Sequence, residues 1–311
     1  MGSLLNLTTK TLSNNLNIKK LSQKQQDRVL GYFLLLPITI IVIGFVGYPF
    51  ITAILMSFQK KYVGVPGEFI GLKNYITLVN SSTFWLVVKN TFIYSLTAVF
   101  LKITLGMLIA KFLNQKFRGN NIVGGIFLIS WVMPIAISAL AWKWIFQEGG
   151  GVLNWILENL GFIDRAIPFL SIPKIALGIV IFVNVWRGLP FFALSFQAAL
   201  KNVPEDQCDA AKIDGASKIQ IFRYVELPNI LSVVLIVLTL TTVWTFADFQ
   251  VVWLLTKGGP GNLTQVFATY TYEIAIMTGN LGLGVTVSLI MFPFLATLIF
   301  FITNFMSKIK Q

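Results

Sequence analysis

Side chains that could do chemistry are scarce in this chain. Its 311 residues include no histidine, and the single cysteine is Cys208, so neither the commonest general base nor a disulfide is available. The sequence holds no G-x-x-x-x-G-K-[ST] phosphate cradle, no nucleophile elbow and no Cys/His cluster with metal-ligand spacing. It therefore predicts no catalytic residue, no metal site and no cofactor bound by this chain, which is not expected to be an enzyme.

Two charges inside apolar runs are the first candidates for function. Arg187 lies in VNVWRGLPFF and Asp248 lies in VWTFADFQVVW. A charge at mid-membrane costs several kcal/mol unless it faces a partner or a wet cavity. The two opposite charges predict either an interhelical ion pair that fixes packing or two poles of one water-filled path. Both alternatives place them inside a helix bundle.

A polar island, residues 203–230, is the second candidate. It concentrates carboxylates and basic groups between two apolar runs, and it reads as two short helices with a turn at Asp214-Gly215. Asp209 with Lys212, and Asp214 with Lys218, have the i,i+3 and i,i+4 spacing of helical ion pairs. Gly215 suits a left-handed or closely approached backbone. The simplest alternative is a solvated loop between two helices.

The elements that must position these residues are transmembrane helices. The chain is 56% hydrophobic and 12% charged, whereas an average soluble domain has roughly 25% charged residues. Apolar runs long enough to cross a bilayer recur along it. They predict an all-α integral membrane protein with six spans, at about residues 29–58, 85–113, 122–146, 174–200, 231–256 and 281–306.

Glycine and proline predict where these spans are irregular. We expect kinks in the first span, a break at Pro134 in the third, and an interruption at Gly188 and Pro190 in the fourth. The first run is too long for a signal-peptide core and is expected to be a retained helix. GVLNWILENLGF in the second outer loop predicts a short amphipathic helix on the membrane surface.

The distribution of Lys and Arg predicts the orientation. Basic residues concentrate in the N-terminal segment 1–28, near residues 111–121, in the polar island and at the C-terminus. The positive-inside rule places these segments, and hence both termini, in the cytosol, with residues 29–311 as the transmembrane domain. The same bias accounts for the net charge of +12, so nucleic-acid binding is not expected.

The order of residues in the polar island resembles the EAA motif of permease subunits of ABC importers. An acidic residue, two alanines, a glycine four residues on and a later Leu-Pro mark the cytosolic coupling helices of that family. The matching positions here are Asp209, Ala210, Ala211, Asp214, Gly215, Leu227 and Pro228. One position differs from the family motif, because Asp209 is present where the motif has Glu. The resemblance implies a type I ABC-importer transmembrane fold and a coupling loop at about residues 201–228.

Further segments resemble the carbohydrate-uptake branch of the same family. They are GEFIGLKNY with Phe84-Trp85, LGMLIAKFLNQKFRG, WKWIFQEGGGVLN and LLTKGGPGNLTQVFATY. The last is similar to the L-T-x-G-G-P segment of that branch. The resemblance implies ATP-driven import of a sugar, oligosaccharide, polyol or glycoside across a bacterial-type cytoplasmic membrane.

A sugar pathway needs aromatic faces for apolar C–H patches, with amides and carboxylates for hydroxyls. The candidates are Trp186, Arg187, Trp244, Phe246, Asp248, Gln250 and Tyr270. The alternative is that these aromatics only pack helices or form interfacial belts.

The resemblance also implies an assembly. It comprises a second homologous permease, two cytosolic ATPase subunits that bind ATP and Mg, and an extracytoplasmic solute-binding protein. Two other functions stay open from the residues alone. An ion-coupled secondary transporter would use Arg187 and Asp248, and a non-transporting scaffold would need no polar interior.

Overall fold

The computed structural model describes residues 22–115 and 117–309 and divides the chain into two compact units, residues 1–55 and 56–311. Residues 1–21, which make up most of the predicted N-terminal segment 1–28, lie outside the described residues.

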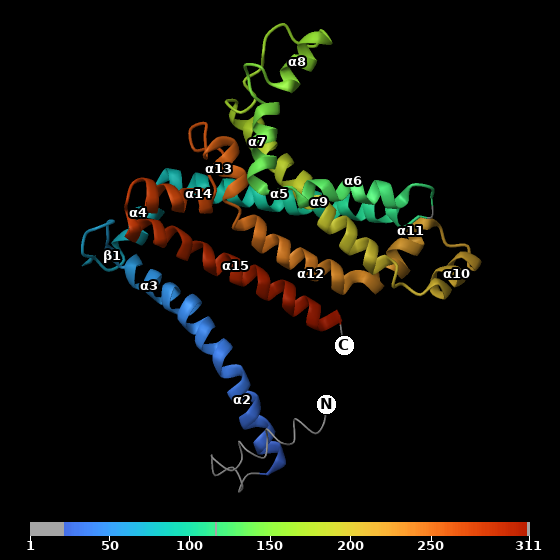
Figure 1. The fold of residues 1–311 in the computed structure, drawn as a ribbon, viewed down its shortest axis with the longest axis horizontal. Helices are drawn as coiled ribbons and strands as arrows, with labels where there is room; N and C mark the ends of the chain where they lie inside the picture. Colours follow the sequence, from blue (N-terminus) through green and yellow to red (C-terminus); the bar gives the residue numbers. More distant parts are fainter. Residues whose placement is uncertain (1–21, 116, 310–311) are drawn as a thin grey trace. The chain divides into compact units, whose positions relative to one another are not determined.

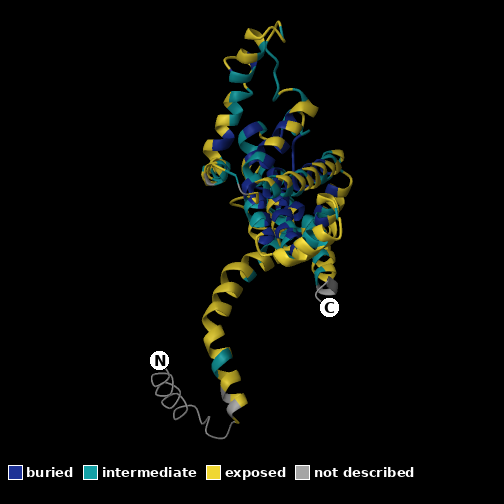
Figure 2. Cartoon of the chain, turned by 90° about the vertical axis from the view of Figure 1, so that its right-hand side faces the viewer, coloured by how far each residue is buried: buried dark blue, intermediate teal, exposed yellow. Residues whose placement is uncertain are grey.

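The first unit is dominated by one long helix. It comprises α2 (Gln23–Val42), the π-helical turn η2 (Ile43–Gly47) and most of α3 (Tyr48–Ser57). The helix begins in the polar segment, earlier than the predicted start at Val29. Kinks were predicted in this span. Pro37 lies inside α2, and Gly44 and Gly47 lie in the π-helical turn η2. Its apolar side chains are largely exposed, as expected for a surface that lipid covers (Figure 2).

The second unit consists mainly of helices with one small hairpin. Strands β1 (Gln59–Lys60) and β2 (Glu68–Phe69) pair antiparallel, with Gln59 opposite Phe69. The helices are α4 (Lys73–Val79), α5 (Ser82–Leu113), α6 (Asn120–Val132), α7 (Ile135–Ile145), α8 (Val152–Asn159), α9 (Pro173–Leu200), α10 (Glu205–Ile213), α11 (Lys218–Ile221), η3 (Phe222–Glu226), α12 (Leu227–Phe246), α13 (Gln250–Thr256), α14 (Phe267–Tyr272), η4 (Glu273–Met277) and α15 (Leu281–Ile309).

The core of this unit lies where α5 packs along α9 and α12 packs against both (Figure 1). Gly106 permits the α5–α9 contact, because a Cβ there would lie 2.5 Å from the Cβ of Phe192. Tyr94, Ala98 and Phe192 are among the fully buried side chains of this interface. α15 packs against α12 and α14 at the edge of the bundle. The bundle thus surrounds its polar residues with tightly packed apolar ones.

The predicted break in the third span is present and is sharp. α6 and α7 meet at Met133-Pro134 with a bend of 95°. Proline lacks the N–H that would continue the helix, and Met133 before it is extended, with ψ of 132°. Among the described residues, five helices are long and apolar enough to cross a membrane, and the bent pair makes six if it counts as one span.

The predicted interruption of the fourth span is wrong. α9 runs without a break through Gly188 and Pro190. Pro190 is buried, and Gly188 faces α5, where an added Cβ would lie 3.0 Å from the Lys102 side chain. Packing against a neighbouring helix therefore overrides the local tendency of these residues to end a helix.

The fifth span differs from its prediction at both ends. Helix begins at Lys218, inside the polar island, and continues through η3 into α12. It stops at Phe246 and resumes at Gln250 as α13, so the predicted continuous helix to Thr256 is interrupted. Asp248 lies in this break.

The loops that the sequence predicts to lie outside the membrane carry more structure than expected. The loop expected between residues 59 and 84 contains the hairpin and α4. The short helix predicted from GVLNWILENLGF forms as α8. Asn154 anchors α8, because its amide donates to the carbonyls of Gln147 and Ile167 at 3.1 and 3.0 Å and its oxygen accepts from the Ile167 N–H at 2.9 Å.

Candidate functional site

A polar cavity of about 670 Å³ lies within the bundle of the second unit. Its volume is typical of small-molecule sites. Both helix breaks contribute to its wall. The lining residues are Lys102 on α5, Trp131 on α6, Ile135 on α7, Asn184, Arg187, Gly188, Phe191 and Phe192 on α9, Thr241, Trp244 and Thr245 on α12, Ala247, Asp248 and Phe249 in the break, and Gln250 on α13.

Asp248 is held by three elements. Tyr94 on α5 donates its hydroxyl to Oδ2 at 2.5 Å, and Asn184 on α9 donates its amide to the same oxygen at 2.7 Å. The backbone N–H of Val251 donates to Oδ1 at 3.3 Å, so the carboxylate also caps the first turn of α13. The carboxylate therefore fixes the break between α12 and α13 against two other helices.

The two cations of the cavity are not paired with this carboxylate. Lys102 donates to the hydroxyl of Thr245 at 3.0 Å. Arg187 Nε is buried and has no hydrogen-bond partner among the described residues, and no ion pair joins Arg187 to Asp248 there. Of the two alternatives from the sequence, the structure favours two poles of one cavity over a packing ion pair.

Aromatic rings cover one side of the cavity. Phe191 contacts Trp131 at a centroid distance of 4.9 Å and Trp244 at 5.6 Å. Rings in this arrangement offer apolar faces next to the amides of Asn184 and Gln250. The cavity can therefore accept a polar molecule that has both apolar patches and hydroxyls.

The structure brings four of the predicted pathway residues together: Arg187, Trp244, Asp248 and Gln250. Trp186 instead contacts Trp142 at 5.3 Å, Phe246 contacts Phe92 at 5.5 Å, and Tyr270 packs in a separate cluster with Phe84 and Phe267. Sequence reasoning missed Asn184 and Tyr94. A polar side chain three residues before Arg187 in the same apolar run was the available signal for Asn184.

The polar island forms the two short helices that were predicted, α10 and α11, with Gly215 between them at φ +79°. An L-residue rarely adopts this left-handed backbone, which explains the glycine. Asp209 pairs with Lys212 at 2.8 Å, and this hydrogen bond raises the pKa of the lysine. The second predicted pair, Asp214 with Lys218, does not form. Asp214 is the C-cap of α10, and the turn separates it from Lys218, which begins α11.

The residues matched to the motif lie on the surface of the island. Asp209, Ala210, Asp214, Gly215 and Pro228 are exposed, and Ala211 and Leu227 are half-buried. Three large apolar side chains beside them are also open to solvent: Ile213 at 86%, Ile219 at 77% and Tyr224 at 70%. Small residues flanked by exposed apolar ones form a surface suited to another protein.

The island is attached to the bundle by side-chain contacts. Glu226 of η3 pairs with Lys111 near the end of α5 at 2.9 Å, and the same ammonium lies 4.3 Å from the centre of the Phe222 ring. Asn229 of α12 donates to Gln207 of α10 at 2.9 Å. Cys208 packs partly against the neighbouring apolar cluster. Its burial, with the nearby Glu226 carboxylate, raises the pKa of the thiol.

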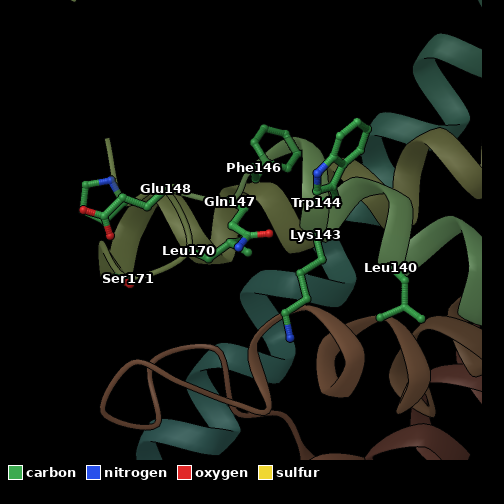
Figure 3. Close-up of a pocket in the computed structure, with 9 residues that line it drawn as sticks. Leu140, Lys143, Trp144, Phe146, Gln147, Glu148, Leu170 and Ser171 are labelled. Carbon is green, nitrogen blue, oxygen red and sulfur yellow. The ribbon is translucent and has the colours of Figure 1, made fainter. Parts of the chain in front are cut away.

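A second cavity of about 380 Å³ lies at the end of α7. Lys143, Gln147 and Glu148 line it together with Trp144 and Ser171. Figure 3 shows Lys143 and Trp144 pointing to opposite sides of α7. Several of its lining residues belong to the segment WKWIFQEGGGVLN, but none of the candidate site residues predicted from the sequence lines this cavity.

Comparison with known proteins identifies the class. Residues 102–311 match the family described as "binding-protein-dependent transport system inner membrane component". A probable ABC transporter permease, y4oQ of Sinorhizobium fredii, is 35% identical over 81% of this chain and 82% of its own length. The trehalose/maltose transport system permease MalF of Thermococcus litoralis is 31% identical over 90% of this chain and 94% of its own.

The fold agrees with this result. A chain of a bacterial ABC transporter involved in the import of the acidic polysaccharide alginate superposes with a TM-score of 0.80 at 22% identity, covering 93% of this chain and 99% of that one. The chain belongs to the binding-protein-dependent transport system inner membrane component family. It is a multi-pass permease of the inner membrane with the type I ABC-importer fold, and it is the non-catalytic subunit, since ATP hydrolysis belongs to partner proteins.

Proposed function

We propose that this permease carries a sugar, oligosaccharide or related glycoside through the cavity between α5, α9 and α12. The single observation that supports this most strongly is the composition of the cavity wall. It joins Trp131, Phe191 and Trp244 to the polar groups of Asn184 and Asp248 within one space of about 670 Å³. The named substrates of a relative, trehalose and maltose, have the chemistry that such a wall recognises.

Each part of the wall has a role in the proposal. The rings stack on the apolar C–H faces of the sugar, as aromatic side chains do with other apolar surfaces. Arg187 Nε, which is buried without a partner, donates to a hydroxyl oxygen, and the buried Oδ1 of Asn184, also without a partner in the described chain, accepts from a hydroxyl. Asp248 holds the break in place and leaves the cavity open to these contacts.

The polar island docks the ATPases in this proposal. Its exposed surface, with Asp209, Ala210, Ala211, Asp214 and Gly215 on α10 and its turn and Leu227-Pro228 at the start of α12, fits a groove on a cytosolic partner. The complete importer contains a second permease and two ATPase subunits, which bind the ATP and Mg. ATP-driven approach of the ATPases moves the islands together and opens the cavity toward a docked, loaded binding protein.

Reconstitution tests the substrate and the pathway together. The permease, with its partner subunits and binding protein, is placed in proteoliposomes and supplied with a panel of radiolabelled sugars and amino acids. We expect ATP-dependent uptake of a sugar, and we expect Trp244→Ala to lower it about tenfold, since aromatic stacking contributes roughly 0.5–1.5 kcal/mol per ring beyond its buried area.

Trp155 on α8 supplies the matched control, because it is an exposed tryptophan outside the cavity. Trp155→Ala should leave uptake within about twofold, as surface substitutions usually cost little. ATP-dependent uptake of an amino acid with no uptake of any sugar would contradict the proposed substrate class. Uptake that ignores ATP would contradict the coupling.

A further inference from the structure

Five side chains spread along α5 make polar contacts with one stretch of chain, residues 226–267. At one end of the helix, Asn90 donates to the carbonyl of Asn262 at 3.0 Å, and the Phe267 N–H donates to the hydroxyl of Thr91 at 3.0 Å. Tyr94 bonds Asp248 and Lys102 bonds Thr245 at the level of the cavity. Lys111 pairs with Glu226 at the other end.

These contacts span nearly the whole helix. From Asn90 to Lys111 the axis of α5 extends about 30 Å, at 1.5 Å per residue. The outer contact fixes the loop that follows α13, the central ones fix the cavity wall, and the last one fixes η3 in the polar island. The helix is thus attached to the polar island, the cavity and the outer loop by separate polar bonds.

The Lys111–Glu226 pair stands out among these bonds. α9 and α12 continue directly into the polar island through the backbone, but α5 is joined to it by side chains, 115 residues apart in the chain, through this pair and the contact of Lys111 with Phe222. The side chains are only 34% and 20% exposed. Such a half-buried pair is less screened than a surface pair, and removing one partner leaves the other uncompensated.

We propose that Lys111 and Glu226 are positioning residues for transport, through which a displacement of the polar island moves α5 and, with it, the outer loop at residues 257–267. This inference rests on the proposed function. In this proposal α5 moves as a rigid body. A displacement of η3 moves Lys111, and the hydrogen bonds of Tyr94, Lys102 and Asn90 transmit the displacement to the cavity and the outer loop. Glu226 is the last residue of the π-helical turn η3, directly before α12.

Charge exchange tests the proposal in the complete importer. Lys111→Glu and Glu226→Lys each place like charges together and should lower the sugar transported per ATP hydrolysed about tenfold, in line with coupling energies of contacting residues. The double exchange Lys111→Glu/Glu226→Lys should restore the ratio to within about threefold of the unmodified importer. Arg118→Glu reverses a charge on an exposed arginine in the turn between α5 and α6, outside the coupling loop, and should leave the ratio unchanged.

A spin label gives a readout that a purely structural pair would not change. With Cys208→Ser to remove the native thiol, a label at Leu263→Cys reports on the outer loop. We expect its mobility to change on addition of ATP in the otherwise unmodified importer, to stop responding in Lys111→Glu and to respond again in the double exchange. A response that persists in a folded Lys111→Glu importer would overturn the inference, as would a double exchange that assembles but rescues neither readout. Absence of ATP-driven uptake in the unmodified importer would instead overturn the proposed function.

Discussion

The polar island and the cavity are built in opposite ways. The island is a contiguous stretch whose helices, turn and exposed residues follow from neighbouring letters of the sequence. The cavity is assembled from side chains of α5, α6, α7, α9, α12 and α13, and its central carboxylate is held by Tyr94 and Asn184, which lie 154 and 64 residues away in the chain. The island is formed by residues close together in the sequence and is exposed, whereas the cavity is formed by residues far apart in the sequence and lies between packed helices.

This difference suggests that energy coupling and substrate passage depend on separate parts of the permease. An exposed surface of small residues can be fitted by another protein without disturbing the bundle. A cavity between packed helices changes shape only when those helices move, because packed interiors switch between discrete arrangements. We therefore expect substitutions in the island to impair energy coupling and substitutions in the cavity to impair passage of substrate.

The largest effect is expected where the cavity depends on helix packing. Gly106→Leu inserts a side chain where even a Cβ would lie 2.5 Å from Phe192. Overpacking of this kind costs typically 1–3 kcal/mol and more when a backbone cannot shift, so little folded permease should be recovered in detergent. Gly178→Leu on α9 is the control, since nothing lies within 4 Å of a Cβ there. Equal yields of the two variants on size-exclusion chromatography would show that the α5–α9 contact is loose.

The next effect concerns the island. Gly215→Asp places a charged L-residue at φ +79° in the turn between α10 and α11. A non-glycine residue at such a backbone costs of order 1–3 kcal/mol, and the substitution adds a carboxylate to the proposed docking surface. We expect uptake to fall below detection while membrane insertion stays normal. Gly161→Asp, at φ +71° in an outer loop with open space around it, should transport normally. Normal uptake by Gly215→Asp would remove the docking role.

The cavity is tested more gently by Asp248→Asn. The amide keeps the size of the carboxylate but loses its charge, and it cannot accept from both Tyr94 and Asn184 as strongly, since hydrogen bonds to charged groups contribute about 1.5–3 kcal/mol against about 1 for neutral ones. We expect sugar uptake to fall roughly ten- to a hundredfold. Tyr94→Phe, which removes one of the bonds, should give a smaller loss. An Asp248→Asn importer with unchanged uptake would show that the fixed break is not needed for passage.

The smallest effect is a labelling rate. Burial and the Glu226 carboxylate raise the pKa of the Cys208 thiol above its ordinary value of 9.0, and only the thiolate reacts with a maleimide. A raised pKa keeps the thiol protonated at neutral pH. The rate of labelling should therefore be low at pH 7 and should continue to increase above pH 9. Asp206→Cys in a Cys208→Ser background supplies an exposed thiol whose rate should level off earlier. Identical pH profiles would show that the island leaves Cys208 open to solvent.

Much of the island could be predicted from sequence because its signals are local. The turn at Asp214-Gly215, the pair Asp209–Lys212 and the proline that opens α12 all follow from spacing within one or two helical turns. The pair Asp214–Lys218 failed because Asp214 lies at the end of α10 instead of within a helix. The i,i+4 spacing alone did not show that the turn would separate Asp214 from Lys218.

The cavity could be predicted only in part because its signals are tertiary. Arg187 and Asp248 were visible as charges in apolar runs, but their separation depends on how α9 and α12 pack. The break at Ala247–Phe249 contains neither glycine nor proline, so no local signal marks it. Trp186 is adjacent to Arg187 in sequence yet faces Trp142, because successive residues of a helix point about 100° apart.

The most direct test of the division between island and cavity is to measure hydrolysis of ATP and uptake of sugar in the same proteoliposomes. Asp248→Asn should retain the stimulation of ATP hydrolysis by the loaded binding protein while uptake falls, since its island is unchanged. Gly215→Asp should lose both the stimulation and the uptake. Loss of stimulated hydrolysis in Asp248→Asn, with normal stimulation in Gly215→Asp, would contradict the account.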